Sequence, residues 1–244
     1  MAENDASDLF FSAGAPVHMK IGGKISPVGE APLFPGAAKQ MAYSLMSEAQ
    51  IRQFEAAREM NLAFSMEGTG RFRINVYLQR TEVAMVVRYV KSDVPSIASL
   101  SLPSVLEALV MEKRGLILVV GASGSGKSAT LAAMIDYRNE NDAGHILCIE
   151  DPIEFLHRHK KSVVDQREVG IDTDSFDAAL RNAMREAPDV IMIGEILDRQ
   201  TMQHAITYSE TGHLCLSTLH SSNANQAIDR ILNFFPESAS GQLL

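Results

Sequence analysis

The chain of 244 residues is 46% hydrophobic and 21% charged, which is typical of folded proteins and leaves room for two domains. With 22 Lys+Arg against 30 Asp+Glu the net charge is -8, which argues against general binding to nucleic acid. The sequence shows neither an apolar run long enough to cross a membrane nor a signal peptide. We therefore predict a cytoplasmic protein that is not inserted in a membrane.

Residues 1–97 mix short alternating segments with one helical stretch, which predicts a small α+β domain. Segment 71–77 alternates apolar with polar residues, as a strand with one buried face requires. Arg73 then points away from the core, and Arg88 lies near the end of a second predicted strand. Polar residues around Pro95 break the pattern, so we place a linker there.

Residues 98–244 follow a different pattern, in which apolar runs alternate with helical stretches. Such runs are typical of strands buried on both faces of a mainly parallel sheet. The runs are 116–120, 146–149, 190–193 and 214–219, and a helical apolar stripe comprises Phe176, Ala179, Leu180, Ala183 and Met184. Both cysteines, Cys148 and Cys215, lie in these runs, which favours buried reduced thiols over a disulfide.

Residues 121–128, Gly-Ala-Ser-Gly-Ser-Gly-Lys-Ser, match the phosphate-loop pattern G-x-x-x-x-G-K-[ST], between a predicted strand and a predicted helix. The glycines let backbone N–H groups turn toward phosphates, and the helix amino terminus adds a favourable partial charge. We predict that Lys127 contacts the β- and γ-phosphates of ATP and that Ser128 binds Mg²⁺. The predicted nucleotide-binding set is Gly121, Ser123, Gly124, Ser125, Gly126, Lys127, Ser128 and Ala129.

Acidic residues and a histidine follow other predicted strands, at the edge where the carboxyl ends of a parallel sheet meet. Glu150 follows one strand and Glu195 another, and ATP hydrolysis needs a carboxylate that holds the metal or orients water. His220 closes a further strand and is a candidate donor to the γ-phosphate. Each of the three also fits a plain structural role, and His213 fits a helix-to-strand turn equally well. The basic run at 157–161 is interpreted as a solvated loop.

Together these segments resemble the type II/IV secretion ATPases (GspE-like), and within them the type IV pilus retraction ATPases of the PilT/PilU type. The resemblance covers nearly the whole chain. Its motifs are 121–128, 149–154 (Ile-Glu-Asp-Pro-Ile-Glu), 166–170 (Gln-Arg-Glu-Val-Gly), 189–195 (Asp-Val-Ile-Met-Ile-Gly-Glu) and 210–220 (Glu-Thr-Gly-His-Leu-Cys-Leu-Ser-Thr-Leu-His). It implies an α/β fold, with a P-loop, RecA-like parallel-sheet ATPase core preceded by a small α+β, PAS-like amino-terminal domain.

The resemblance also implies an ATP-hydrolysing motor that powers pilus retraction and twitching motility as a hexameric ring. Such a ring would lie at the cytoplasmic side of a bacterial inner membrane, with a pilus platform protein and a related retraction ATPase as partners. The implied catalytic residues are Glu195, Glu150, Arg73, Arg88 and His220; Glu154 and His213 join the nucleotide-binding set, and Ser128 and Glu195 bind the metal. In this family the two arginines reach the γ-phosphate of a neighbouring subunit, where guanidinium stabilises developing charge.

Two features depart from the family pattern. Leu197 stands where the family has an arginine and Gln200 where it has a glutamate. Arg199 is a candidate replacement, because alternation along an extended segment keeps it on the same side as position 197. The chain ends at Leu244, whereas the family continues into a helical carboxyl-terminal region, so we expect a truncated member.

These departures leave a second hypothesis open: a nucleotide-binding accessory subunit that hydrolyses little or no ATP and modulates a related pilus or type II secretion motor. A third hypothesis is a nucleic-acid-dependent ATPase of the same core fold. That function needs a basic channel with stacking aromatic residues. The excess of acidic over basic residues and the absence of Trp argue against this third hypothesis.

Overall fold

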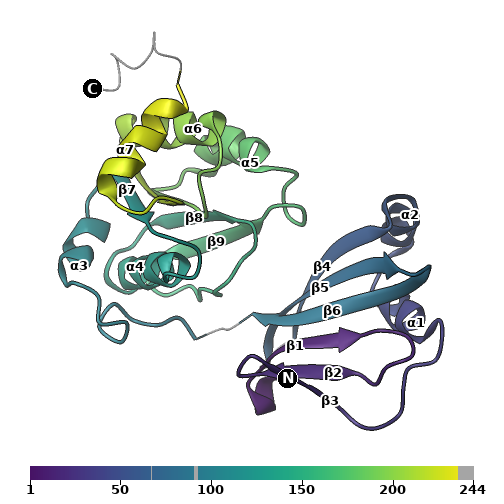
Figure 1. The fold of residues 1–244 in the computed structure, drawn as a ribbon. Coiled ribbons are helices and arrows are strands. Elements are labelled where there is room, and N and C mark those ends of the chain that lie inside the picture. The colour runs from purple at the N-terminus through teal and green to yellow at the C-terminus, as the bar shows by residue number, and fades with distance from the viewer. Residues whose placement is uncertain (67, 91–92, 236–244) are drawn as a thin grey trace. The chain divides into compact units, whose positions relative to one another are not determined.

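The computed structural model describes residues 1–66, 68–90 and 93–235 (Figure 1). The chain divides into two compact units, Met1–Ser92 and Asp93–Leu244, and each unit has its own sheet. No helix among the described residues is both long enough and apolar enough to cross a lipid bilayer.

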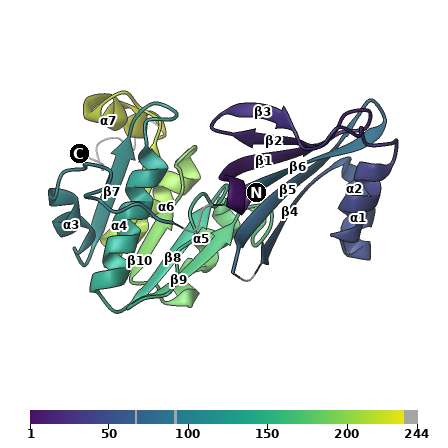
Figure 2. The same ribbon diagram turned by 90° about the horizontal axis from the view of Figure 1, so that it is seen from below.

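The first unit is an antiparallel sheet with two helices against its apolar face (Figure 2). Its strands lie in the order β3-β2-β1-β6-β5-β4. Their bounds are β1 Ala6–Phe11, β2 His18–Ile21, β3 Lys24–Pro27, β4 Glu59–Met66, β5 Gly70–Gln79 and β6 Glu82–Val90, and a 3-10 turn at Ala2–Asn4 precedes them. Helices α1 (Ala37–Ser44) and α2 (Glu48–Ala57) connect β3 to β4.

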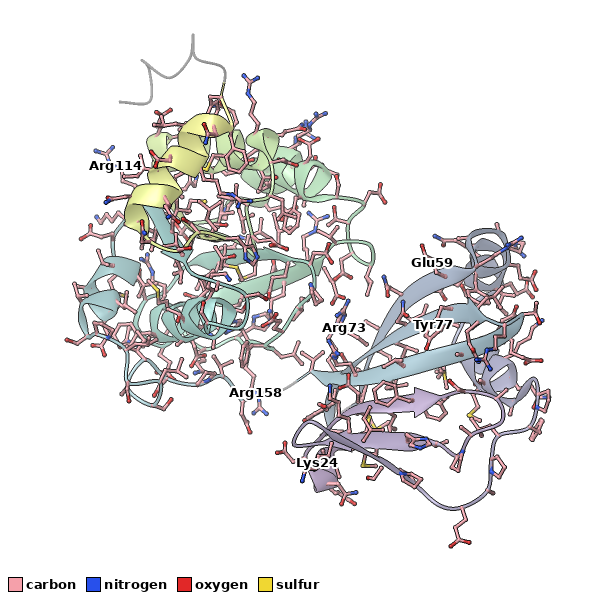
Figure 3. All side chains as sticks on the ribbon, in the orientation of Figure 1. Lys24, Glu59, Arg73, Tyr77, Arg114 and Arg158 are labelled. Carbon is pink, nitrogen blue, oxygen red and sulfur yellow. The ribbon has the colours of Figure 1, made fainter. Side chains whose placement is uncertain are left out.

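Strand β5 has the alternation that its sequence predicts. Phe72, Ile74 and Val76 are buried and pack with the two helices. Arg73 lies opposite Arg88 in the β5–β6 ladder. Because opposed residues of an antiparallel pair share one face of the sheet, both arginines lie on the face away from the helices, where Arg73 projects from β5 (Figure 3).

The second unit is a five-stranded sheet in the order β7-β11-β10-β8-β9, and every pairing in it is parallel. The strands are β7 Gly115–Val120, β8 His145–Glu150, β9 Val163–Glu168, β10 Val190–Ile193 and β11 Leu214–Leu219. The helices are α3 Val105–Val110, α4 Lys127–Asn141, α5 Phe176–Ala183, α6 Arg199–Glu210 and α7 Ala224–Asn233, and a 3-10 turn at Met184–Glu186 follows α5. This parallel α/β core agrees with the predicted fold class.

Two apolar clusters hold the second unit together, one on each face of its sheet. Helices α3 and α4 contribute to the first cluster, and α5, α6 and α7 contribute to the second. Strands β10 and β11 are buried throughout, as predicted, but every residue of β7 is only half-buried, because β7 is an outer strand of the described sheet. Met184 also departs from the predicted stripe: it lies in the 3-10 turn and is 43% exposed.

The prediction of buried reduced thiols is confirmed. Cys148 and Cys215 are free and fully buried. Burial raises the pKa of the Cys215 thiol to about 12 and raises that of Cys148 as well. Thiols that stay protonated at neutral pH are poor nucleophiles, so both act as small apolar residues of the core.

Candidate active site

One cleft of about 380 Å³ lies at the carboxyl ends of the parallel strands in the second unit. Strand β10 pairs with β8 and with β11, and β11 pairs with β7, all in parallel. The segments after these four strands therefore meet at one edge of the sheet. The residues that they bring to the cleft include Ser123, Gly124, Gly126, Lys127, Ser128 and Ala129 after β7, Glu150, Asp151, Glu154, Phe155 and His157 at or after the end of β8, Gly194 and Glu195 after β10, and Thr218 and His220 at or after the end of β11.

The phosphate loop joins β7 to α4, and two of its three glycines adopt left-handed backbone angles, with φ of 75° at Gly124 and 92° at Gly126. Four other helices begin at a side chain that accepts a backbone N–H of the first turn: Ser47 before α2, Ser175 before α5, Asp198 before α6 and Asn223 before α7. Helix α4 begins after Gly126, without a side-chain cap. Its first N–H groups are thus left for an anion, which the helix dipole also favours.

Lys127 is the first residue of α4, and its Nζ donates to the carbonyl of Ala122 at 2.9 Å. The ammonium group therefore lies against the loop that would surround the phosphates. Gly121 and Ser125 complete the loop but are not among the residues that line the cleft. A Cβ on Gly121 would lie 2.5 Å from Ser125 Oγ, so these two residues shape the loop by close approach.

Glu150 is the last residue of β8 and is only 9% exposed. Burial raises the pKa of its carboxyl from 4.5 to about 7, and hydrogen bonds from Gln166 and from the backbone of Glu154 oppose this rise. Gln166 Nε2 donates to Glu150 Oε1 at 2.9 Å. A carboxylate whose pKa lies near neutrality is suited to accept a proton at physiological pH.

Glu195 and His220 face each other across the cleft edge, with 3.4 Å between Glu195 Oε2 and His220 Nε2. They follow neighbouring strands, β10 and β11, and Thr218 Oγ1 donates to the carbonyl of Gly194 at 2.8 Å between the same strand ends. Both side chains are partly exposed, His220 by 41% and Glu195 by 29%. A substitution at one of these two residues would therefore alter the contacts of the other directly.

Gly194 allows the ends of β8 and β10 to approach closely. A Cβ at this position would lie 3.3 Å from Glu150 Cα and 3.4 Å from the carbonyl of Ile149, both backbone atoms. We expect Gly194→Ala to push the two strand ends apart and to lower stability by about 1–3 kcal/mol. Urea unfolding measures that cost.

Gly144→Ala is the comparison variant, because the three atoms nearest to its Cβ all belong to the Asp189 side chain, with Oδ2 at 2.7 Å and Cγ at 3.3 Å, and none is a backbone atom. A Gly194→Ala variant as stable as the unmodified protein would show that the two strand ends move apart without cost.

His213 is not brought to the cleft. It immediately precedes Leu214, the first residue of β11, so it lies at the opposite end of that strand from His220. Its backbone N–H donates to the carbonyl of Tyr208, and its ring packs edge-on against the Tyr208 ring. Within this unit His213 therefore occupies the helix-to-strand turn, which was the alternative interpretation from the sequence.

The structure shows the surroundings of Leu197, Arg199 and Gln200, the residues concerned in the departure after Glu195. Arg199 is the first residue of α6 rather than part of an extended segment, and its guanidinium lies over the ring of Phe235. The side chain of Gln200 donates to Asp177. Leu197 is 55% exposed. The Arg199 side chain is thus held against Phe235. It does not replace the arginine that the family has at position 197.

The interpretation of 157–161 as a solvated loop is wrong for its first residue. The His157 side chain is 1% exposed, its Nδ1 lies 3.9 Å from Asp136 Oδ1, and it lines the cleft. Arg158 is exposed, as predicted, and projects from the loop (Figure 3). Sequence reasoning also missed Gln166, for which the one available signal was its place at the start of the 166–170 motif.

Arg73 and Arg88 lie in the first unit and line a groove on the polar face of its sheet, together with Asn61 and Asn75. Arg88 Nε donates to Asp8 Oδ1 at 2.7 Å, and the Asp8 side chain is almost fully buried. The Arg88 side chain remains 59% exposed. Arg73 and Arg88 lie directly opposite each other in the ladder, where like charges repel, and the Asp8 carboxylate offsets part of this positive charge.

The donors in the cleft fit Mg²⁺ held jointly with a nucleotide. Among the described residues, no group of three His, Cys, Asp or Glu side chains comes close enough to hold a metal ion by itself. Mg²⁺ usually takes one or two protein oxygens and completes its shell with phosphates and water. The Ser128 hydroxyl and the Glu195 carboxylate, both at the cleft, provide such oxygens.

Comparison with known proteins identifies the family of this chain. A family model described as "Type II/IV secretion system protein" matches residues 3–240. The type IV pilus ATPase PilU of Pseudomonas aeruginosa is 51% identical over 243 residues, which cover 100% of this chain and 64% of that protein. The type IV pilus retraction ATPase PilT of the same species is 43% identical over 235 residues, covering 96% of this chain and 68% of PilT.

The fold comparison agrees with the sequence comparison. The crystal structure of the pilus retraction motor PilT with bound ADP superimposes with a TM-score of 0.92 at 45% identity, covering 99% of this chain and 71% of that one. It matches both the antiparallel first unit and the parallel second unit. This chain spans 64% of the length of PilU, slightly less than two thirds. The chain belongs to the type II/IV secretion system protein family.

Proposed function

We propose that this protein is an ATP-hydrolysing motor subunit of the type IV pilus machinery that acts in pilus retraction. The observation that carries the proposal is the meeting of a phosphate loop, a buried carboxylate with raised pKa, and the Glu195–His220 pair in one cleft. The names of the relatives PilU and PilT, both pilus ATPases, support the same function.

In this proposal the phosphate loop and Lys127 bind the β- and γ-phosphates of ATP. Ser128 and Glu195 hold Mg²⁺, which neutralises charge on the phosphate oxygens when bound. Glu150 accepts a proton from the attacking water, because its raised pKa makes it a base of suitable strength near neutral pH. Glu154 lines the same cleft and contacts the nucleotide. His220, held beside Glu195, responds to the loss of the γ-phosphate.

Arg73 and Arg88 complete the site from a neighbouring copy of the chain. Guanidinium groups stabilise the charge that develops on a transferred phosphoryl group, and an arginine supplied in trans accelerates hydrolysis strongly. The groove on the polar face of the first unit presents both arginines together. Hydrolysis then depends on a ring-shaped homo-oligomer, which we propose to be a hexamer.

We further propose that this ring works at the cytoplasmic side of the inner membrane of a bacterium. Its partners there would be the pilus platform protein and a related retraction ATPase. The names of PilU and PilT, both type IV pilus ATPases, support a role in the pilus machinery. Co-purification of the chain with the platform protein from bacterial membranes tests it directly.

The decisive experiment measures ATP hydrolysis against protein concentration. We expect the rate per subunit to rise steeply where rings form, because each site needs a neighbour. In Lys127→Ala, ATP binding should weaken about ten- to one hundredfold and hydrolysis should fall to about 1%. The control is Lys113→Ala, which removes an exposed lysine of the same unit and should change neither quantity.

Other outcomes of this experiment have clear meanings. Hydrolysis that stays undetectable at concentrations where rings are visible, with ATP binding intact, would favour the nucleotide-binding accessory subunit instead. The exposed Leu197 in place of a cation is the feature that this alternative would explain.

A further inference from the structure

The Gln166 side chain connects the carboxylate of Glu150 to the wall of the nucleotide cleft. Gln166 lies in β9 opposite Cys148, and Glu150 lies two residues further along β8, opposite Glu168. Because residues two apart on a strand share a face, Gln166 and Glu150 lie on the same face of the sheet. The amide of Gln166 can therefore reach the carboxylate from the neighbouring strand.

Three hydrogen bonds fix the orientation of this amide. Nε2 donates to Glu150 Oε1 and to the carbonyl of Phe155, each at 2.9 Å. Oε1 accepts the backbone N–H of His157, also at 2.9 Å. An amide turned by 180° would place its oxygen against two acceptors and its N–H₂ against a donor, so one orientation is strongly preferred.

The three partners of Gln166 all line the cleft. Glu150 ends β8, and Phe155 and His157 belong to the loop that follows it. Gln166 thus ties that loop to the carboxylate. We propose that Gln166 is a positioning residue for ATP hydrolysis, which holds the Glu150 carboxylate in the orientation needed to accept a proton from water.

The inference rests on the proposed role of Glu150 as the base. Its surroundings show why a donor is needed there. The carboxylates of Glu154 and Glu168 repel the negative charge on Glu150, and the hydrogen bonds from Gln166 and from the Glu154 backbone counteract them. The other charged or titratable groups at the cleft are Lys127, Asp151, His157, Glu195 and His220, and Cys148 precedes Glu150 on β8.

The test replaces Gln166 by Met, which keeps the length of the side chain but cannot donate or accept. We expect kcat for ATP hydrolysis at pH 7 to fall about ten- to one hundredfold, with little change in KM, because a misplaced base affects the chemical step. The acid limb of the kcat–pH profile should move to higher pH, since the lost hydrogen bond favoured the ionised form of Glu150.

Asn139→Ala is the matched control, because it loosens the loop after β8 without removing a hydrogen bond to Glu150. Asn139 is a buried amide on α4 that holds the same loop through the carbonyl of Arg158 and the N–H of Lys160, but it forms no hydrogen bond with Glu150. If Gln166 acts only by fastening the loop, both variants will lower kcat without moving the acid limb. That result would overturn the proposal.

A second measurement needs no turnover. The difference in unfolding free energy between each protein and its Glu150→Gln derivative, followed against pH, reports the titration of Glu150 alone. We expect this curve to lie at higher pH in Gln166→Met than in the unmodified protein. Unchanged curves would refute the positioning role. An unmodified protein that hydrolyses no ATP would refute the proposed function, and with it the catalytic part of this proposal, while the curve would still show whether Gln166 stabilises the ionised form of Glu150.

Discussion

Replacing Arg73 and Arg88 together by Ala is expected to lower kcat for ATP hydrolysis by about 10³-fold or more, because an arginine supplied by a neighbour contributes about 10³ to 10⁵. ATP binding should persist, since the phosphate loop lies in the other unit. Because removal of Arg88 leaves the buried Asp8 carboxylate without its ion-pair partner, which is destabilising, urea unfolding of the double variant checks that the first unit stays folded. Nucleotide binding and steady-state hydrolysis, measured on the same preparation, separate these effects. The control Arg52→Ala removes a 71% exposed arginine from α2, away from the polar face of the sheet, and should leave both quantities unchanged.

Mixing two inactive variants tests whether the arginines act between subunits. The Arg73→Ala, Arg88→Ala protein keeps an intact cleft, and Glu195→Gln keeps intact arginines. In randomly mixed rings about one interface in four would combine an intact cleft with intact arginines. We therefore expect the mixture to regain hydrolysis that neither variant has alone. A mixture as inactive as its components, with mixed rings shown to form, would contradict action in trans.

Glu150→Gln is the second variant with a large expected effect. A general base typically contributes about 10²- to 10⁴-fold, so kcat should fall by about that factor while KM changes little. In the unmodified protein kcat should decline below pH 7, because Glu150, with its pKa raised to about 7, becomes protonated there and cannot accept a proton. Steady-state kinetics between pH 5.5 and about 8.5 measure both effects. Glu112→Gln, at an exposed glutamate, is the control.

The same variant should be more stable than the unmodified protein at high pH. Burial raises the pKa of Glu150 from 4.5 to about 7. Below pH 4.5 the carboxyl is protonated in the folded and unfolded states alike, so no stability is lost. Between pH 4.5 and about 7 the carboxyl ionises in the unfolded state but stays protonated in the folded state, so stability falls by up to about 3 kcal/mol, and above pH 7 this full cost remains. Urea unfolding at pH 5 and about 8 should show Glu150→Gln gaining stability mainly at the higher pH; an equal change at both pH values would contradict the assignment.

The features that depend on neighbouring residues along the chain could be predicted from the sequence. The phosphate loop is a short motif between a strand and a helix, and both are present at β7 and α4. The alternation of Phe72, Ile74 and Val76 identified a strand with one buried face, which is confirmed. These predictions hold because strand and helix periodicity, and the backbone freedom of glycine, are local properties.

Features that depend on how strands are ordered and aligned were not predictable. The parallel sheet predicted that Glu150, Glu195 and His220 share the carboxyl edge with the phosphate loop, but the order β7-β11-β10-β8, which makes Glu195 and His220 neighbours, is not stated by the sequence. His213 and His220 are separated by the length of one strand; the sequence predicted His220 at the carboxyl edge but left two interpretations of His213 open, and the structure places His213 at the other end of β11. The burial of His157 and the bond from Gln166 to Glu150 follow from the β8–β9 register. The sequence by itself determined which chemical groups this protein carries and on which elements, because those are local properties; only the tertiary structure decided which groups face one another, because strand order, direction and register are set by packing across the whole sheet.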